Sequence, residues 1–529
     1  MATRSAQSYW LLSLIFIFHA AWLGMRQLDS DLFWFDEMIQ LHRSTGDIYG
    51  PVDFAEVLSR VRGSQSWPPV HSFAAAAWGM VSGWSGFATR YLSLEAGLLS
   101  IAVAYALGRD MFSRQAGLIA AVLMASAAFF IYYMHEFRGY TMLVLFSTAS
   151  VWFYWRTLVF SRHRNVMRFL LFMSLLLTLH THYGAVFTPL IIGLYHLFLK
   201  KPRNRSWLIT LLVIGAAAVA FIPWVVYALQ GVVEREMSEP RGLPPSTALS
   251  EIVDGYSNGL WFIALPLVGF ALLRSRNTDR AMLFMMSWLF LGLIFLLGLN
   301  QYAQFMFHVR HALAFLVPVV LLVAVGLSRL PARWWWFKLS VIVLWVGLGL
   351  VYSQSIDFMR STSGFRVPMQ SAPMRAALAT IRACVDGTDA VVFMGPDAGL
   401  DSERFNALTV AYYAGDTSTR YGQINNLVNM AAYDPGSSYI ELFGDYASAF
   451  DDLIDRANEV WVFGLVQPTL KHAFLPEFQQ LISKRYDYGD LVIHTPDLIA
   501  YVYSNDAIVS CDEVNAELPP SRADLISTE

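Results

Sequence analysis

The chain has 529 residues, of which 56% are hydrophobic, 15% are aromatic and only 15% are charged. Soluble domains usually carry about 25% charged residues, so this composition excludes an ordinary soluble protein. The formal net charge is −3 and the sequence has no dense basic tract, which argues against nucleic acid as a partner.

Apolar residues gather in long blocks along residues 1–355. A helix needs about 20 apolar residues to cross the hydrocarbon layer, and about 11 segments reach or approach that length. In chain order they cover residues 10–25, 91–107, 116–133, 140–155, 169–180, 185–199, 207–229, 260–273, 281–299, 312–327 and 339–352. The sequence therefore predicts a polytopic α-helical membrane protein with about 11 spans.

The segment 69–84 is shorter, is rich in Ala and Gly, and opens at the pair Pro68-Pro69. Its length and composition favour a re-entrant or interfacial helix over a full crossing. This choice also keeps the parity of the spans consistent with the charges of the loops.

Five short loops are rich in Lys and Arg, and an even number of predicted helices separates each loop from the next. They cover residues 108–115, 156–168, 200–206, 274–280 and 328–338. Cytoplasmic loops collect basic residues, so we expect all five on the inner side of the cell's inner (plasma) membrane. The last predicted helix then leads outward, which places the C-terminal domain outside the cytoplasm.

The outer loops carry ionisable residues next to the membrane, where such groups are costly and often functional. The first outer loop, residues 26–89, contains the adjacent carboxylates Asp36 and Glu37 and, after the proline pair, His71. Two carboxylates just after a helix are suited to act as a general base or as metal ligands. The alternative is that Asp36 is the N-cap of a short helix through residues 39–42.

The second outer turn contains His135, Glu136, Arg138 and Tyr140. An Arg side chain in this position can bind a phosphate through two parallel hydrogen bonds. The alternative is an interfacial anchor, in which Arg138 pairs with Glu136 and the Tyr side chains lie at headgroup depth.

The third outer turn contains His180, His182 and Tyr183. Two His residues at positions i and i+2 lie on different faces of a helix, which makes a shared metal ion unfavourable unless the helix breaks there. Hydrogen bonding or contact with a substrate is the favoured interpretation.

The fourth and fifth outer loops cover residues 230–258 and 300–311. The fifth ends with His308, Arg310 and His311, of which the two His residues are three positions apart and can share a helix face. Interfacial packing of snorkelling side chains is the alternative to such a shared face.

From about residue 356 the sequence becomes that of a soluble domain, which we expect to be a periplasmic α/β domain over residues 356–529. Helices are predicted over residues 374–385, 403–413 and 473–485. Strands are predicted over residues 389–394, 459–464, 498–503 and around 491–493, with a loop-rich stretch up to residue 448. One interpretation of this domain is a purely structural cap.

The chain has two cysteines, Cys384 and Cys511, and both lie in this predicted outer domain. An oxidising compartment lets disulfides persist, which favours a bond between them. Two unrelated thiols are the alternative.

The order of these motifs resembles the GT-C superfamily of glycosyltransferases that use polyprenyl-phosphate sugars. The nearest resemblance is to the protein O-mannosyltransferase and aminoarabinose-transferase group of bacterial membrane proteins. The matching pieces are D-E at 36–37, W-P-P-V-H at 67–71, R-x-L-S at 90–93, Y-A-L-G-R at 105–109, Y-x-x-H-E-x-R-x-Y at 132–140, H-T-H-Y at 180–183 and R-H-A-L at 310–313. Many relatives have His before the proline pair, where this chain has Trp67.

The resemblance implies a membrane glycosyltransferase that moves a hexose or pentose from a polyprenyl-phosphate donor to an acceptor hydroxyl at the outer face. The acceptor is a glycan, a lipid or a protein, and membrane lipid surrounds the prenyl chain. No cofactor is implied other than an optional divalent cation.

The resemblance also implies roles for individual residues. Asp36 would be the base of an inverting displacement, and Glu37 would orient the acceptor or hold a cation. Arg138, and after it Arg310, would bind the donor phosphate. The expected substrate contacts are His71, His135, Glu136, Tyr140, His180, His182 and Tyr183.

Two other functions compete with this one, namely a secondary transporter and a non-catalytic membrane scaffold. The chain shows no internal repeat and has a long acidic first outer loop, both unusual for a transporter. The carboxylate of Asp36 argues against a scaffold that has lost activity.

Overall fold

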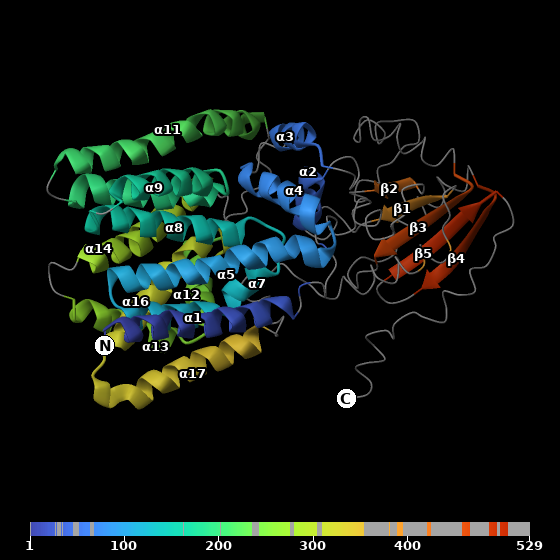
Figure 1. Ribbon diagram of the computed structural model, residues 1–529. Coiled ribbons are helices and arrows are strands. Elements are labelled where there is room, and N and C mark those ends of the chain that lie inside the picture. The colour runs from blue at the N-terminus through green and yellow to red at the C-terminus, as the bar shows by residue number, and fades with distance from the viewer. Residues whose placement is uncertain are drawn as a thin grey trace. The chain divides into compact units, whose positions relative to one another are not determined.

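The computed structural model describes residues 2–26, 28, 33, 35–45, 52–63, 68–161, 163–200, 203–234, 243–275, 280–303, 309–353, 380, 384, 389–394, 420–424, 457–465, 486–494 and 498–505. The chain divides into two compact units, one of residues 1–30 with 40–366 and the other of residues 31–39 with 367–529. We describe each unit by itself (Figure 1).

The first unit is helical. Its helices before the third outer turn are α1 (Ala2–Met25), α2 (Phe35–Ser44, whose first residues belong to the second unit), α3 (Phe54–Gly63), α4 (Val70–Ser82), α5 (Gly86–Met111), α6 (Arg114–Ala125), α7 (Ala128–Met134), α8 (Tyr140–Val159) and α9 (Arg164–Leu179). After that turn come η2 (Tyr183–Val186), α10 (Phe187–Leu194), η3 (Tyr195–Leu199), α11 (Arg205–Glu234), α12 (Pro245–Tyr256), α13 (Trp261–Leu273), α14 (Arg280–Met286), η4 (Ser287–Leu291), α15 (Gly292–Ala303), η5 (Val309–Phe315), α16 (Leu316–Arg329), η6 (Ala332–Trp334) and α17 (Trp335–Tyr352).

The apolar helices make this a multi-pass membrane protein. Among the described residues, six helices are long and apolar enough to cross a membrane, or up to eight if each of two bent pairs is one span. Each of the 11 predicted segments coincides with a helix or a run of consecutive helices, but several are shorter or more broken than predicted. The number of crossings therefore stays a prediction. The helix α4 has 13 residues, about 20 Å of length, which is too short to span the hydrocarbon layer.

The segment 116–133, predicted as one continuous helix, is broken. Helices α6 and α7 meet at an angle of 64° around Ser126 and Ala127. The buried amide of Asn258 occupies this break, where it accepts a hydrogen bond from the Ala128 N–H and donates one to the Ser126 carbonyl. An apolar pattern cannot reveal this break because the partner comes from elsewhere in the chain.

The fourth outer loop, predicted over residues 230–258, is also largely helical. Helix α11 continues to Glu234, and α12 occupies Pro245–Tyr256 before a sharp bend of 87° into α13. Pro245 is the first residue of α12, where its missing N–H costs nothing. The polar residues of α12 interrupt the apolar pattern, which is why the sequence suggested a loop.

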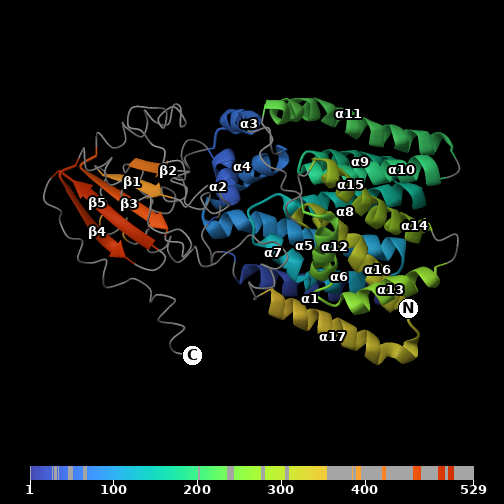
Figure 2. The same ribbon diagram turned by 180° about the vertical axis from the view of Figure 1, so that it is seen from behind.

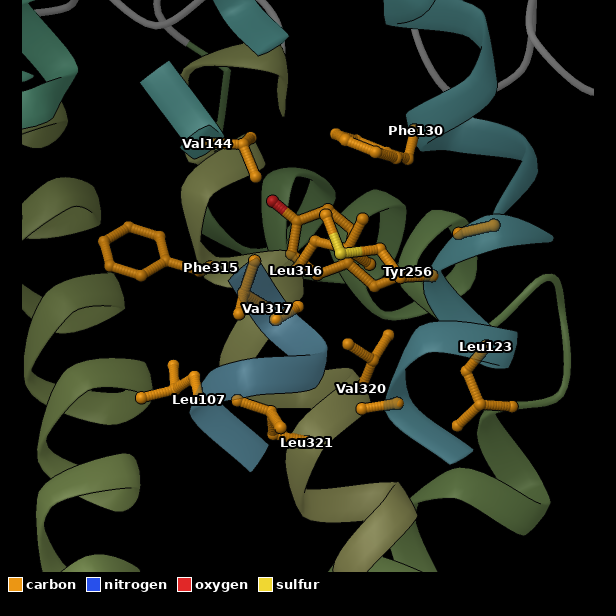
Figure 3. Packing of buried hydrophobic residues seen from close by; sticks show 14 of the residues in the cluster. Leu107, Leu123, Phe130, Val144, Tyr256, Phe315, Leu316, Val317, Val320 and Leu321 are labelled. Carbon is orange, nitrogen blue, oxygen red and sulfur yellow. The ribbon is translucent and has the colours of Figure 1, made fainter. Parts of the chain in front are cut away.

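Helix α16 lies at the centre of the helical unit, whereas α11 and α17 lie at its periphery (Figures 1 and 2). Figure 3 shows part of this core, in which Val320 and Leu321 of α16 lie with Leu107 of α5, Leu123 of α6 and Tyr256 of α12. Apolar side chains on α11 and α17 are exposed, as expected for helices that face lipid.

The first three basic loops contact one another, and the other two contact helix ends next to a basic loop, so all five lie at one end of the helical unit, as their parity predicted. The side of the membrane on which this end lies stays a prediction. The joining contacts are Arg156 to Asp110 (3.4 Å), Arg168 to Ser206 Oγ (2.8 Å), Tyr195 Oη to Arg280 O (3.2 Å) and Arg329 to Ala271 O (2.7 Å).

The described part of the second unit contains a five-stranded sheet with the order β2-β1-β3-β5-β4. Its strands are β1 (Ala390–Met394), β2 (Arg420–Ile424), β3 (Glu459–Leu465), β4 (Tyr488–His494) and β5 (Leu498–Ser504). β1 pairs in parallel with β2 and β3, whereas β5 pairs antiparallel with β3 and β4.

Four of these strands coincide with predicted ones. β2 falls in the stretch predicted to be loop-rich, because its sequence R-Y-G-Q-I lacks an apolar alternation and its pairing with β1 supplies the order. The three predicted helices fall almost wholly outside the described residues, so the α/β class of this unit stays a prediction. Cys384 is disulfide-bonded, and Cys511, its predicted partner, lies outside the described residues.

Candidate active site

The second outer turn, between α7 and α8, is held in place by its own backbone and by α5. The Arg138 N–H donates to the Glu136 carbonyl at 2.7 Å, and Ser93 Oγ donates to the Arg138 carbonyl at 3.2 Å. A Cβ added at Gly139 would lie 3.4 Å from His71 Cβ and 3.3 Å from Thr181 Cγ2. The absence of a side chain at Gly139 therefore lets this turn approach α4 and the third outer turn closely.

The third outer turn joins α4 and η5 to the same place. The Val70 N–H, at the start of α4, donates to the His180 carbonyl at 2.9 Å. His182 Nδ1 accepts from the Gly184 N–H at 2.9 Å, and a Cβ on Gly184 would lie 3.1 Å from the His311 carbonyl oxygen. Four segments that are far apart in the sequence thus meet at one end of the helical unit. They are the start of α4, the second outer turn, the third outer turn and η5.

Aromatic and cationic side chains pack where these segments meet. The ring of His182 lies 5.5 Å from that of Tyr140 and 5.2 Å from that of His311, centroid to centroid. The guanidinium carbon of Arg310 lies 5.4 Å from the Tyr140 ring centroid. Arg138 and Arg310 are only 2% and 4% exposed. Two arginines thus lie deep in one aromatic and histidine-lined site, which we call the arginine site.

His71 lies at the edge of the arginine site, with its ring centroid 5.4 Å from that of Phe137. It is 3% exposed, and neither ring nitrogen has a hydrogen-bond partner among the described residues. Burial, together with the positive charge of Arg138, lowers the pKa of His71 to about 3. Its imidazole is therefore neutral near pH 7 and presents one N–H donor and one acceptor.

His182 has the same electrostatic character. Burial is again the main cause, and the charges of Arg138 and Arg310 add to it, so the pKa of His182 falls to about 3. Because the charges of both arginines lower the pKa of the same His182 ring, both guanidinium groups lie near that ring. The positive charge of the arginine site comes from the guanidinium groups, while these two histidines stay neutral.

Three of the predicted site residues contact neighbouring helices and not the arginine site. They are His180, Tyr183 and His135. His180 Nδ1 contacts the Leu176 carbonyl at 2.9 Å, and its ring packs against Phe221 of α11. The Tyr183 hydroxyl accepts a hydrogen bond from Trp224 Nε1 at 3.3 Å, also on α11.

His135 Nε2 lies 3.4 Å from the carbonyl of Leu23 in α1. Glu136 lies in the same turn as Arg138 and is buried. The structure thus brings together His71, Arg138, Tyr140, His182 and Arg310, and turns His135, His180 and Tyr183 towards neighbouring helices.

Asp36 and Glu37 lie in the first turn of α2 and belong to the second unit. Asp36 is half-buried and Glu37 is fully buried. Helix α2 begins at Phe35, so Asp36 lies inside its first turn and not at the N-cap position of the alternative interpretation. A carboxylate there still interacts favourably with the positive end of the helix dipole.

No group of three His, Cys, Asp or Glu side chains that could hold a metal ion occurs among the residues that the structure describes. We assign no chemical step to a divalent cation.

Two members of the arginine site were missed by sequence reasoning. His311 contacts His182, and Tyr133 packs edge-on against Tyr140 with ring centroids 5.2 Å apart. Both lie inside motifs already singled out, but His311 was paired with His308, which lies outside the described residues. Tyr133 lies in α7, after the break between α6 and α7 that the sequence did not predict.

Comparison with known proteins gives the fold a name. Residues 66–227 match the protein family described as dolichyl-phosphate-mannose-protein mannosyltransferase. No curated protein matches the sequence.

Among solved structures, ArnT from Cupriavidus metallidurans in the apo state is similar with a TM-score of 0.63 and 13% identity, covering 94% of this chain and 99% of that one. The same protein bound to undecaprenyl phosphate gives a TM-score of 0.58 with 13% identity, covering 92% and 97%. The arabinofuranosyltransferase AftD from Mycobacteria gives 0.51 with 12% identity, covering 94% of this chain and 42% of that one.

The chain is thus a multi-pass membrane protein built like known membrane glycosyltransferases. Its fold is that of the GT-C superfamily, as the order of its motifs predicted.

Proposed function

We propose that this protein transfers a hexose or pentose from a polyprenyl-phosphate donor to an acceptor hydroxyl at the outer face of the membrane. The observation that carries this proposal is the burial of Arg138 and Arg310 in one site beside Tyr140 and His182. Guanidinium groups bind phosphate oxygens through charge-assisted, often paired hydrogen bonds, so two of them in one site suit a phosphate ligand. A phosphate at headgroup level is the feature that every lipid-linked sugar donor shares.

The reaction is a single displacement. The acceptor oxygen forms a bond to the anomeric carbon while the bond from that carbon to the phosphate oxygen breaks, which inverts the configuration. Asp36 takes the proton of the acceptor hydroxyl, and Glu37 orients the acceptor. The polyprenyl phosphate leaves with additional negative charge, which a pre-positioned guanidinium group stabilises.

The neutral histidines suit a role in substrate binding. His71 has two buried ring nitrogens without a partner among the described residues, so a sugar hydroxyl or a phosphate oxygen can hydrogen-bond to them. Tyr140 and His182 line the same site. The acceptor is a glycan, a lipid or a protein, and the prenyl chain lies among the helices in membrane lipid.

The similarity to a structure that binds undecaprenyl phosphate supports the choice of donor class. The predicted location in the inner membrane, with residues 356–529 outside the cytoplasm, places donor and acceptor on the outer face. A transporter could also bind an anion between the two arginines, but it would release its substrate chemically unchanged.

The test follows radiolabelled lipid-linked sugars by thin-layer chromatography in wild-type cells and in cells that lack the gene. We expect one labelled polyprenyl-phosphate sugar to accumulate in the deletion strain while a labelled acceptor disappears. The purified protein should convert that same lipid, together with acceptor, into free polyprenyl phosphate. Unchanged lipid-linked sugars, or movement of the lipid across vesicles without cleavage, would contradict the proposal.

A further inference from the structure

The corner between α12 and α13 has an unusual backbone. The two helices meet at 87°, and the turn between them contains Asn258 with φ of 50° and Gly259 with φ of 76°. Positive φ is uncommon outside glycine, and Asn is among the residues that tolerate it best. This backbone turns the Asn258 side chain into the helical unit, where it is fully buried.

The Asn258 amide joins three other segments of the chain. Its Nδ2 donates to the Ser126 carbonyl at 2.8 Å and to the Trp345 carbonyl at 3.1 Å. Its Oδ1 accepts from the Ala128 N–H at 3.0 Å.

Helix α7 begins at Ala128 without a side-chain cap from its own N-cap residue, Ala127. The first N–H groups of a helix lack a partner within that helix, so Asn258 caps α7 from across the fold. The amide thus satisfies both sides of the break between α6 and α7.

Tyr256, two residues before Asn258, contacts η5, the element that contains Arg310. Its buried hydroxyl donates to the carbonyl of Ala312 in η5, two residues after Arg310. Its ring packs against Phe129 of α7, with centroids 5.5 Å apart.

A row of ring contacts continues from this corner to the arginine site. Phe129 contacts Tyr133 at 5.1 Å, Tyr133 contacts Tyr140 at 5.2 Å, and Arg310 lies over Tyr140 at 5.4 Å. One short turn therefore supports both α7, which leads to Arg138, and η5, which contains Arg310.

We propose that Asn258 and Tyr256 are positioning residues that set the spacing between Arg138 and Arg310. This inference rests on the proposed binding of a donor phosphate by those two arginines. Parallel hydrogen bonds from two guanidinium groups to one phosphate require an arrangement accurate to about 0.5 Å. Without the Asn258 amide, the buried Ser126 carbonyl and Ala128 N–H lose their partner. That loss is costly, and any shift of α7 that finds its N–H a new partner also moves the turn that holds Arg138.

The test compares Asn258→Gly with a matched control. Glycine accepts the positive φ, so this substitution removes the amide and leaves the backbone unstrained. His163 also has positive φ, 60°, and lies at the end of the helical unit with the basic loops, so His163→Gly repeats the change away from the arginine site. The measurement is the Kd of the purified, folded proteins for undecaprenyl phosphate in detergent, with thermal unfolding recorded alongside.

We expect Asn258→Gly to raise this Kd by roughly tenfold or more, the size of effect known for residues that hold metal ligands in place. His163→Gly should stay within about twofold of wild type. Tyr256→Phe keeps the ring contacts and removes only the hydroxyl, so it provides a second measurement if Asn258→Gly does not fold. It should also raise the Kd.

The outcomes separate the two proposals. If wild type binds and the folded variants bind equally well, the positioning role is wrong, even when their melting temperatures fall. If wild type itself does not bind undecaprenyl phosphate, the proposed donor site is wrong, and this inference falls with it.

Discussion

Arg138 and Arg310 are the residues on which the proposed chemistry depends most directly. They come from segments separated by more than 150 positions and share one buried site with Tyr140 and His182. Two alternatives were a pairing of Arg138 with Glu136 and snorkelling of Arg310 to the membrane surface. Neither requires Arg138 and Arg310 to lie in one site. Their convergence therefore favours an anion site over those alternatives.

Substituting each arginine by lysine tests how the phosphate is held. Lysine keeps the charge but cannot provide two parallel donors, so Arg138→Lys should raise the Kd for undecaprenyl phosphate about tenfold and remove most of the activity. Arg62→Lys, at an exposed position of α3, is the matched control and should behave as wild type. If Arg138→Lys is active and Arg310→Lys is not, the two roles are exchanged. Activity in both would place the phosphate elsewhere.

The proposed base is tested by Asp36→Asn. Loss of a general base typically lowers the rate by about 10²–10⁴-fold, so transfer should almost disappear while expression and membrane insertion stay normal. Asp53→Asn is the control, because it alters an exposed carboxylate whose Oδ1 accepts from the Ala55 N–H, a role that Asn can keep. A rate above about a tenth of wild type would show that Asp36 is not the base.

At the scale of elements, the break between α6 and α7 shapes the site, and α17 supports that break from outside. Trp345 of α17 donates through Nε1 to the Leu123 carbonyl at 3.0 Å and accepts from Asn258 through its own carbonyl. Gly349, one turn later, packs directly on Ser126. A peripheral, lipid-facing helix thus stabilises an irregular piece of backbone in the interior.

Two glycines on α17 provide a matched pair for this contact. A Cβ at Gly349 would lie 1.9 Å from the Ser126 carbonyl oxygen, whereas a Cβ at Gly347 has no atom within 4 Å. Gly349→Ala should therefore destabilise the protein by about 1–3 kcal/mol through overpacking. Gly347→Ala should be neutral or stabilising by up to about 1 kcal/mol, because alanine favours helices. Thermal unfolding in detergent measures both, and equal melting temperatures would contradict the contact.

At the scale of the whole molecule, the orientation in the membrane decides whether donor and acceptor can meet outside the cytoplasm. The five basic loops share one end of the helical unit, and the arginine site is built from the loops predicted to lie at the opposite end. The enrichment of cytoplasmic loops in Lys and Arg then predicts an outer location for that site and for residues 356–529.

Reporter fusions test this orientation. A phosphatase that is active only outside the cytoplasm should be active when fused after Tyr352, at the end of α17, and inactive when fused at Arg203. The opposite pattern would reverse the orientation and place the arginine site at the inner face. Protein levels of the two fusions, measured by immunoblot, control for unequal expression.

The sequence by itself determined the class of the molecule and indicated five residues of its site. Long apolar segments require helices in lipid, because every backbone polar group there must be satisfied internally. The ordered motifs located Arg138, Tyr140, His182, Arg310 and His71, since residue type and spacing are properties of the chain alone.

Only the tertiary structure decided which of these residues meet. It turned His135, His180 and Tyr183 towards other helices, added Tyr133 and His311, and broke one predicted helix at Ser126–Ala127. At that break the amide of Asn258, 130 residues from Ala128, caps the following helix. Local periodicity carries no information about a hydrogen bond between such distant positions, so the geometry of the site emerges only when the helices pack.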